Sequence, residues 1–472
     1  MTEVVETYPV ARVGSGHPRI DEVFGGGLPA NSVTVLAGLP GSGKTLLAQQ
    51  YVFANATEHS PAVYLTTVSE PLDKVIRYGQ ELTFFDIDLV NSAVFYADAG
   101  AVLSADGLPG FLKTVTGLLA AHTPGVLVID SFKALRSYAT DEGEFRRFLN
   151  DLSSRLAAQP VTSLWLGEYT DAEIGESAEF AVADAIIRLG TNVMAERRMR
   201  VLTVLKLRGS GFLSGQHAYR LSNRGLDLFP RLADGGAETP YQLDGHRVST
   251  GIPNLDDLVG GGYHPGGSAL VAGPPGVGKT IAALHFLRAG TERGERGLFA
   301  AMQENPVQLA RTAAGFGWTL RPGEVDVVHH VPVDLYVDEW MYEILDRVQR
   351  DGIRRLVIDS LGDLQNAAPD TRRFQEMFYS FVQRCSRLGV TVLMTLEVPD
   401  LFGPARLSDN GVTHLSDNVV LLQYLRGDSR IKKAITILKA RASRHDLSVR
   451  EYSITDTGIT LGDAFGAEQD LR

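Results

Sequence analysis

The sequence predicts an α/β protein of two successive domains, each with a mainly parallel sheet covered by helices on both faces. Two observations lead to this prediction. The pattern GxxxxGK[ST] occurs at residues 38–45 and again at residues 273–280, each time between a short apolar run and a helix-like segment. An apolar run that ends in aspartate follows each copy, at residues 126–130 and 356–359. Continuous apolar runs are typical of strands that are buried on both faces of a parallel sheet.

The length of the chain also indicates more than one domain. Its 472 residues exceed what a single core usually holds, and the repeat sets the number of domains at two. The tract ADGGAETP at residues 233–240 is polar and rich in turn-forming residues, which predicts a linker between the copies. We therefore expect one domain over residues 1–235 and the other over residues 236–472.

The composition predicts a soluble, cytoplasmic protein with no membrane association. The chain is 44% hydrophobic and 21% charged, and we find neither a long apolar run nor a signal-peptide pattern. Its single cysteine, Cys385, excludes an intrachain disulfide and a thiolate metal cluster. The net charge of −11 disfavours a general nucleic-acid-binding surface, because non-specific affinity comes mainly from neutralising phosphates.

The repeated glycine-rich pattern is a phosphate-binding loop. Its backbone N–H groups turn toward nucleotide phosphates, its lysine reaches the β- and γ-phosphates, and its hydroxyl holds Mg²⁺. We therefore expect ATP and Mg²⁺ as cofactors; a purely structural turn is the alternative, and the flanking strand and helix argue against it. The expected binding residues are Gly38, Gly41, Ser42, Gly43, Lys44 and Thr45 in the first copy and Gly273, Gly276, Val277, Gly278, Lys279 and Thr280 in the second.

The aspartates that end the later apolar runs are candidates for the metal side of each site. Asp130 and Asp359 both follow a predicted core strand. An aspartate in this place can hold the Mg²⁺ shell opposite the loop hydroxyls of Thr45 and Thr280. A helix cap or turn after a core strand is the alternative interpretation.

A hydrolytic site also needs a carboxylate that orients or deprotonates the attacking water. Glu70 ends the stretch VYLTTVSE and Glu304 ends LFAAMQE, so each follows the next predicted strand after its loop. The carboxyl end of that strand faces the nucleotide crevice in this type of sheet. The alternative is an acidic residue that is favoured by the dipole of the following helix.

A basic pair at alternate positions occurs late in each half. Lys206 and Arg208 lie in TVLKLRGS, and Lys439 and Arg441 lie in TILKARAS. On a strand, such positions point to the same face. Two cations there can bind a phosphate, and in a ring they can bind a phosphate of the neighbouring subunit's nucleotide. The alternative is an edge strand whose charges protect it from aggregation.

These motifs together resemble the KaiC family, double-domain circadian-clock ATPases within the KaiC/RadA branch of RecA-like proteins. The resemblance covers nearly the whole chain. It includes an aspartate before a triple glycine within residues 20–28 and 250–263, the stretch LSDNVVLLQY at residues 415–424, and RHDLSVREYSIT at residues 444–455. It implies two RecA-like lobes per chain, a homo-hexameric double ring with nucleotides at subunit interfaces, and Lys-x-Arg pairs that act in trans.

The resemblance also adds candidates and shows departures. Glu168 and Glu397 match a family position near the nucleotide. The family has two adjacent glutamates at the catalytic position of each lobe, whereas this chain has Ser69 before Glu70 and Gln303 before Glu304. Glutamine cannot accept a proton as the family's first glutamate does in autophosphorylation. Of the two family phosphoacceptors, this chain keeps one hydroxyl, that of Thr413, and has His414 at the other position.

The sequence therefore predicts an ATPase with two Mg²⁺-dependent sites per chain, completed at the subunit interfaces of a hexamer, with a regulatory or signalling role. Three alternatives stay open. A serine/threonine autokinase of the clock type would carry phosphate on Thr413, and a DNA-dependent relative of RecA and RadA would be stimulated by single-stranded DNA. A nucleotide-gated scaffold would bind ATP to assemble and would be read by an unidentified signalling protein.

Overall fold

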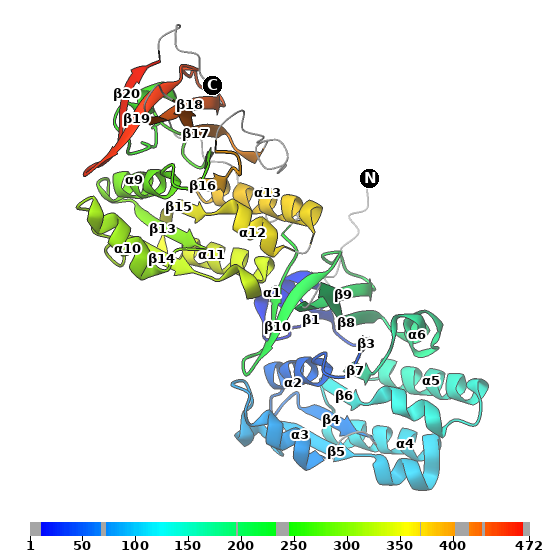
Figure 1. Cartoon of the computed structure of the whole chain (residues 1–472). Coiled ribbons are helices and arrows are strands. Elements are labelled where there is room, and N and C mark those ends of the chain that lie inside the picture. Colours follow the sequence, from blue (N-terminus) through cyan, green and yellow to red (C-terminus); the bar gives the residue numbers. More distant parts are fainter. Residues whose placement is uncertain are drawn as a thin grey trace, which may run out of the picture. The chain divides into compact units, whose positions relative to one another are not determined.

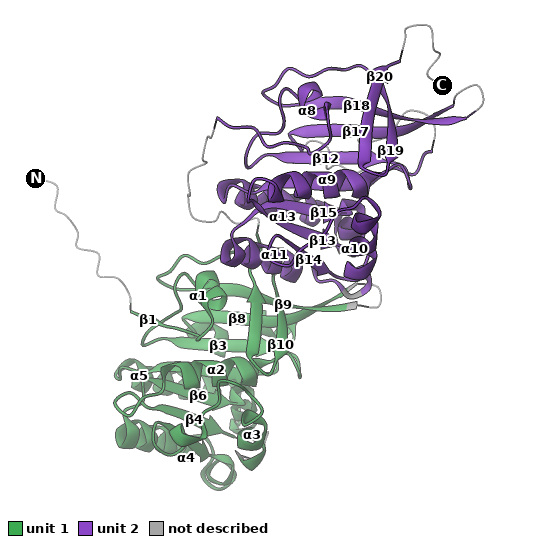
Figure 2. Cartoon of the chain, turned by 90° about the vertical axis from the view of Figure 1, so that its left-hand side faces the viewer, with its two compact units in different colours: residues 1–234 green, residues 235–472 purple. Residues whose placement is uncertain are grey.

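The computed structural model describes residues 11–67, 72–194, 197–232, 245–368, 370–401, 415–426 and 430–465. The chain divides into two compact units, residues 1–234 and residues 235–472 (Figure 2). Within the described residues, each unit contains a nine-stranded sheet with helices packed on it (Figure 1). The predicted α/β class, with a mainly parallel sheet in each half of the chain, is confirmed.

The elements of the first unit alternate between strands and helices over most of its length. Its strands are β1 (Arg12–Val13), β2 (Leu28–Pro29), β3 (Val33–Gly38), β4 (Ala62–Thr66), β5 (Val94–Asp98), β6 (Val126–Asp130), β7 (Thr162–Gly167), β8 (Ala185–Met194), β9 (Arg197–Leu207), β10 (His217–Ser222) and β11 (Gly225–Phe229). Its helices are α1 (Pro18–Val23), α2 (Lys44–Asn55), α3 (Leu72–Gly79), α4 (Gly100–His122), α5 (Glu142–Ala157), α6 (Asp171–Glu176) and α7 (Glu179–Val182), with short 3₁₀ helices at Ile87–Leu89 and Phe132–Tyr138.

The second unit repeats this alternation. Its strands are β12 (Ser268–Gly273), β13 (Arg296–Ala301), β14 (Val325–His329), β15 (Ile353–Asp359), β16 (Thr391–Glu397), β17 (Asn418–Arg426), β18 (Ile431–Ala440), β19 (Arg450–Thr455) and β20 (Gly458–Ala464). Its helices are α8 (Leu255–Leu258), α9 (Lys279–Thr291), α10 (Pro306–Gly315), α11 (Val337–Asp351), α12 (Leu361–Ala367) and α13 (Thr371–Arg387), with a 3₁₀ helix at Pro332–Asp334.

The two sheets have the same strand order. The first runs β11-β10-β9-β8-β3-β7-β6-β4-β5, and the second, read in the same direction, runs β20-β19-β18-β17-β12-β16-β15-β13-β14. From β8 to β5 the pairing is parallel, and β9, β10 and β11 add an antiparallel extension at the other edge. The repeat seen in the sequence is therefore a repeat of topology as well, in which β12 is the counterpart of β3.

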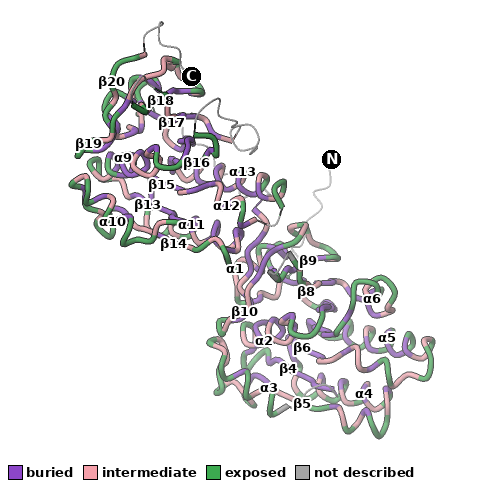
Figure 3. Tube along the Cα trace, viewed as in Figure 1, coloured by how far each residue is buried: buried purple, intermediate pink, exposed green. Residues whose placement is uncertain are grey.

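Helices cover both faces of the first sheet. Leu36 of β3 packs in one core cluster with residues of α1, α2 and α3, whereas Val35 and Ala37 pack in another with residues of α4 and α5. This division follows from the alternation of side chains along a strand. Figure 3 shows buried residues along the central strands of both units. None of the helices in the described parts of the chain is long and apolar enough to cross a membrane.

A buried arginine connects the second sheet to its covering helix. The side chain of Arg355, on β15, is 1% exposed and donates a 2.6 Å hydrogen bond to Glu295. It also donates to the backbone oxygens of Ser249, at 2.8 Å, and of Phe286 in α9, at 2.7 Å. A buried charge of this kind is tolerated because it is paired and hydrogen-bonded.

Removal of this arginine should destabilise the second unit strongly. Arg355→Ala leaves Glu295 and two carbonyl oxygens without their donor, which we expect to lower the free energy of unfolding by about 3 kcal/mol. Arg354→Ala, at the exposed neighbouring position, should cost about 0.5 kcal/mol or less. Urea unfolding of both variants checks this expectation, and equal losses would contradict it.

Candidate functional site

The two glycine-rich loops have nearly the same backbone conformation. Each follows the central strand of its sheet, and Gly43 and Gly278 have φ values of 93° and 112°, which favour glycine. A Cβ on Gly38 would lie 2.3 Å from the backbone oxygen of Leu189, so this strand end also requires glycine. Helices α2 and α9 begin at the loop lysine with no side-chain cap, which leaves their first N–H groups available to an anion.

A tyrosine from the antiparallel extension holds each loop. The hydroxyl of Tyr219, on β10, donates a 2.6 Å hydrogen bond to the backbone oxygen of Ser42, and Tyr452, on β19, makes the same 2.6 Å bond to Val277. Neither tyrosine was predicted from the sequence. Their equivalent places in HAYRLS and REYSIT are a signal that an alignment of the two halves could have found.

The loop lysines fold back over their own loops. The ammonium group of Lys44 donates to the backbone oxygens of the first two loop residues at 3.0 Å each, and Lys279 makes the two corresponding bonds at 3.0 Å each. Both lysines therefore lie on the concave side of the loop, where phosphates would bind.

Carboxylates lie near both lysines. Burial lowers the pKa of Lys44, and the charges of Glu168 and of the strand-end aspartate oppose this shift. Burial likewise lowers the pKa of Lys279, opposed by Glu397, whose carboxylate oxygen is 4.0 Å from the lysine nitrogen, and by its own strand-end aspartate. Glu168 and Glu397, predicted from the family resemblance, thus stand at the edge of the loops.

The structure also brings the loop hydroxyls to the strand-end aspartates. Thr45 donates a 3.0 Å hydrogen bond to Asp130, and Thr280 donates a 2.8 Å bond to Asp359. Hydroxyl and carboxylate oxygens are ligands that suit Mg²⁺, which usually completes its octahedron with water and substrate phosphate. In the part of the chain that the structure describes, no group of three or more His, Cys, Asp or Glu residues is placed to hold a metal by itself. The donor set therefore fits an ion that arrives with a nucleotide.

A second hydrogen bond to each aspartate differs between the two units. Asp130 accepts a 2.7 Å bond from the hydroxyl of Tyr64 on β4, whereas Asp359 accepts a 2.5 Å bond from Thr395 on β16. The strand registers place Phe299 at the counterpart of Tyr64 and Leu166 at the counterpart of Thr395. Each unit thus orients its aspartate from a different neighbouring strand, and neither Tyr64 nor Thr395 was predicted from the sequence.

Glu304 lies near Asp359, the candidate metal ligand of the second unit. It is half-buried after β13, and its Oε2 atom is buried with no hydrogen-bond partner among the described residues. Burial and the negative charge of Asp359 raise the pKa of its carboxyl group. The preceding Gln303 instead donates to Asp363 on α12, at 2.9 Å. An unpartnered carboxylate oxygen beside the aspartate can accept a hydrogen bond from a water molecule.

Two predicted residues cannot be placed. Glu70, the expected counterpart of Glu304 in the first unit, and Thr413, the expected phosphoacceptor, both lie outside the described residues. Their roles stay predictions from the sequence.

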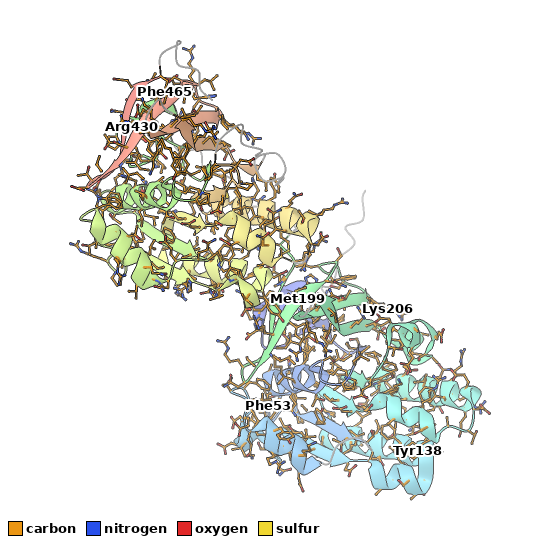
Figure 4. All side chains as sticks on the ribbon, in the orientation of Figure 1. Phe53, Tyr138, Met199, Lys206, Arg430 and Phe465 are labelled. Atoms are coloured by element: carbon orange, nitrogen blue, oxygen red, sulfur yellow. The ribbon has the colours of Figure 1, made fainter. Side chains whose placement is uncertain are left out.

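The Lys-x-Arg pairs are not brought to the phosphate loop of their own unit. Lys206 (Figure 4) is opposite Ile186 of β8, which in turn is opposite Val35 near the start of β3. Arg208 lies further from the loop, 3.4 Å from Asp184, whose carboxylate accepts a hydrogen bond from the backbone N–H of Val33. The loop begins at the other end of β3, so Arg208 is roughly 16 Å away along the strand.

The second pair occupies the same place. Lys439 is opposite Val419 of β17, and Arg441 lies 3.5 Å from Asp417, whose carboxylate accepts from the backbone N–H of Ser268 at the start of β12. Within one chain, therefore, each pair points away from the loop that its own unit contains.

A pocket of about 920 Å³ opens beside the first loop. Its polar end is lined by Lys44, Thr45 and Asp130, and its wall includes Val75 and Tyr78 of α3. Small-molecule sites are concave, mostly apolar and equipped with a few convergent polar groups, over a range of about 300 to 1,000 Å³. The pocket therefore has the size and the lining of a nucleotide site.

Comparison with known proteins agrees with this geometry. A family model described as the KaiC ATPase matches residues 13–233 and again residues 248–464. The chain belongs to the KaiC family. The resemblance inferred from the motifs is thereby confirmed, together with the two tandem RecA-like domains that this family implies, one for each nine-stranded sheet.

Curated relatives match over nearly the whole chain. The circadian clock oscillator protein KaiC of Picosynechococcus sp. is 27% identical over 94% of this chain and 88% of its own length. The circadian clock protein KaiC3 of Synechocystis sp. is 27% identical over 98% of this chain and 93% of its own length. The KaiC of Prochlorococcus marinus is 26% identical over 97% of this chain and 93% of its own length.

The different hydrogen bonds to Asp130 and Asp359 predict a separate loss of Mg²⁺-dependent nucleotide binding at each site. In a Lys279→Ala background, Tyr64→Phe should raise the Mg²⁺ concentration needed for half-maximal binding of a fluorescent ATP analogue by about tenfold, because a hydrogen bond to a charged group is lost. In a Lys44→Ala background, Thr395→Val should do the same at the second site. Tyr96→Phe is the matched control, since Tyr96 lies beside Tyr64 and its buried hydroxyl has no partner among the described residues. An equal loss in the control would contradict this role.

Proposed function

We propose that the protein hydrolyses ATP with Mg²⁺ at two sites per chain, one in the domain of residues 1–235 and one in that of residues 236–472, in a homo-hexameric ring. The observation that carries this proposal recurs in both units. The loop lysine, the loop hydroxyl and the strand-end aspartate converge on one end of the sheet, whereas the Lys-x-Arg pair stands at the other. A complete set of catalytic groups therefore requires a second copy of the chain.

The residues at the loop end account for nucleotide binding. Backbone N–H groups at the start of α2 and α9, with Lys44 and Lys279, bind the β- and γ-phosphates. Thr45 with Asp130, and Thr280 with Asp359, hold the metal. Bound Mg²⁺ supplies charge neutralisation on the phosphates.

Glu304 is proposed to act on the attacking water at the second site. Its buried oxygen accepts a hydrogen bond from the water and takes its proton as the water oxygen bonds to the γ-phosphorus, while the bond to the β-phosphate oxygen breaks and ADP leaves. Glu70 is proposed for the same role at the first site. The amide of Gln303 is engaged by Asp363, so this unit offers one carboxylate rather than two for proton transfer.

The Lys-x-Arg pairs are proposed to act in trans. Lys206 with Arg208, and Lys439 with Arg441, would reach the γ-phosphate of the neighbouring copy and stabilise the charge that develops in the transition state. Arg208 and Arg441 are paired with Asp184 and Asp417, the residues that directly precede β8 and β17. The relatives are named as circadian clock proteins, and by this likeness we propose a regulatory or signalling role.

Hydrolysis by the purified protein with Mg²⁺ tests the proposal. In a Lys44→Ala background, Glu304→Gln should lower turnover at the second site by about 100-fold or more and leave ATP binding intact, since only proton transfer is removed. Glu292→Gln, at an exposed position directly after α9, is the control and should change neither quantity. Turnover that survives Glu304→Gln would contradict the assignment. Phosphate found on Thr413 in the same incubation would favour the autokinase alternative.

Mixing experiments test completion in trans. In a Lys44→Ala background, Arg441→Ala chains keep their second phosphate loop, whereas Lys279→Ala chains keep the arginine, so each alone should be nearly inactive. Rings formed from both should recover part of the native phosphate release, because some neighbours then combine an intact loop with an intact arginine. Absence of recovery in mixed rings of native mass would indicate a site completed within one chain.

A further inference from the structure

The strand that carries each Lys-x-Arg pair contains a β-bulge at the same place. Pairing of β8 with β9 shifts register so that Ile186 is opposite Lys206 and Ile187 is opposite Val204, which leaves Leu205 without a partner residue on β8. Pairing of β17 with β18 shifts in the same way and leaves Leu438 between Ile437 and Lys439. A bulge adds one residue to one strand and redirects side chains.

The added residue in both bulges is an exposed leucine. Leu205 is 45% exposed and Leu438 is 44% exposed, whereas the residues before them, Val204 and Ile437, are buried. Regular alternation would send the residue after an outward-facing leucine inward. The bulge instead leaves Lys206 and Lys439 half-buried on the same side of the strand as the leucine, with the exposed Arg208 and Arg441 two residues further along that side.

A single exposed leucine is ordinary on a protein surface. Here the same residue type, the same degree of exposure and the same bulge occur in two units with different sequences. Bulges are frequent next to active sites, where they aim a side chain. The recurrence therefore indicates a role that goes with the Lys-x-Arg pair.

We propose that Leu205 and Leu438 are interface residues that pack against a second copy of this chain and set the position of the lysine and arginine that follow. This inference rests on the proposed function, because it assigns the leucines to the interface at which those pairs act in trans. The surface of the second copy that receives the leucine lies beside a phosphate loop, because the lysine next to the leucine must reach the nucleotide at that loop.

Both loops have a surface of suitable chemistry beside them. The exposed Tyr78 lines the pocket at the first loop, and the exposed Val307 stands three residues after Glu304 at the start of α10. Exposed carboxylates of Glu168 and Glu397 stand at the edges of the same loops. An apolar surface beside carboxylates is complementary to a leucine that is followed by two cations. This complementarity favours a second copy of the chain as the partner.

The test compares assembly of full-length variants by sedimentation velocity with ATP and Mg²⁺. Leu205→Gln combined with Leu438→Gln keeps both bulges and removes the apolar groups. We expect the protein concentration for half-maximal assembly to rise by about ten- to a hundredfold, as follows from loss of a buried leucine side chain. Deletion of Leu438 alone removes the bulge and restores a regular ladder, in which Lys439 and Arg441 stay on one face of the strand. This deletion should lower phosphate release from second sites in assembled rings, because the leucine that sets the position of the two cations is lost.

Matched controls lie on the same strand pairs. Val193→Gln combined with Ile431→Gln replaces apolar residues that are 68% and 63% exposed, away from the basic pairs, and should leave assembly unchanged. Circular dichroism and binding of a fluorescent ATP analogue show whether each variant is folded. Because the glutamine variants alter exposed positions, they keep the test decisive even if the deletion variant does not fold.

The outcomes separate this inference from the proposed function. A native ring that hydrolyses ATP, together with unchanged assembly of the leucine variants, would overturn the interface role of the leucines alone. Equal loss of assembly in the control variants would overturn it as well. A native chain that stays monomeric with ATP and Mg²⁺ would overturn both the ring and the leucine contact.

Discussion

Parallel pairing is the constraint on which the rest of each unit depends. It brings the carboxyl ends of β3, β6 and β7 to one edge of the first sheet, and those of β12, β15 and β16 to one edge of the second. The phosphate loop leaves the first of these strands, the aspartate ends the second, and a glutamate follows or ends the third. Groups that lie about 80 residues apart in the chain therefore meet within hydrogen-bond distance.

The same constraint separates the groups that are proposed to act together. The antiparallel extension runs back toward the amino end of the central strand, and this direction places Lys206 and Lys439 far from the loops of their own units. Under the proposed function, each unit therefore holds an incomplete site as a consequence of topology. Assembly of several copies then follows as a proposed condition for activity.

The two units orient the strand-end aspartate with different side chains. Tyr64 orients Asp130 from one side of β6, and Thr395 orients Asp359 from the other side of β15. Both arrangements leave the aspartate facing the loop hydroxyl. The tyrosines on β10 and β19, in contrast, are the same in both units and bond to the same loop carbonyl. The loop conformation is therefore the more uniform feature, and the support of the strand-end aspartate the more variable one.

By itself, the sequence determined the features that depend on local pattern. The loops need glycine at fixed spacing, a buried parallel strand must be apolar along its length, and the strand-end aspartate follows directly from that run, so the fold class and the loop residues could be predicted. Tyr64, Tyr219, Thr395 and the unpartnered oxygen of Glu304 could not be predicted in this way, because their roles depend on which strands become neighbours.

Tertiary structure alone also decided the position of the Lys-x-Arg pairs. The alternation of lysine and arginine predicts a shared face, but it does not tell which end of the sheet that face adjoins, nor that a bulge adds an exposed leucine beside it. Register is set by the pairing of whole strands and by their packing against the core. A register shift of one residue leaves the sequence of the motif unchanged but redirects every side chain that follows.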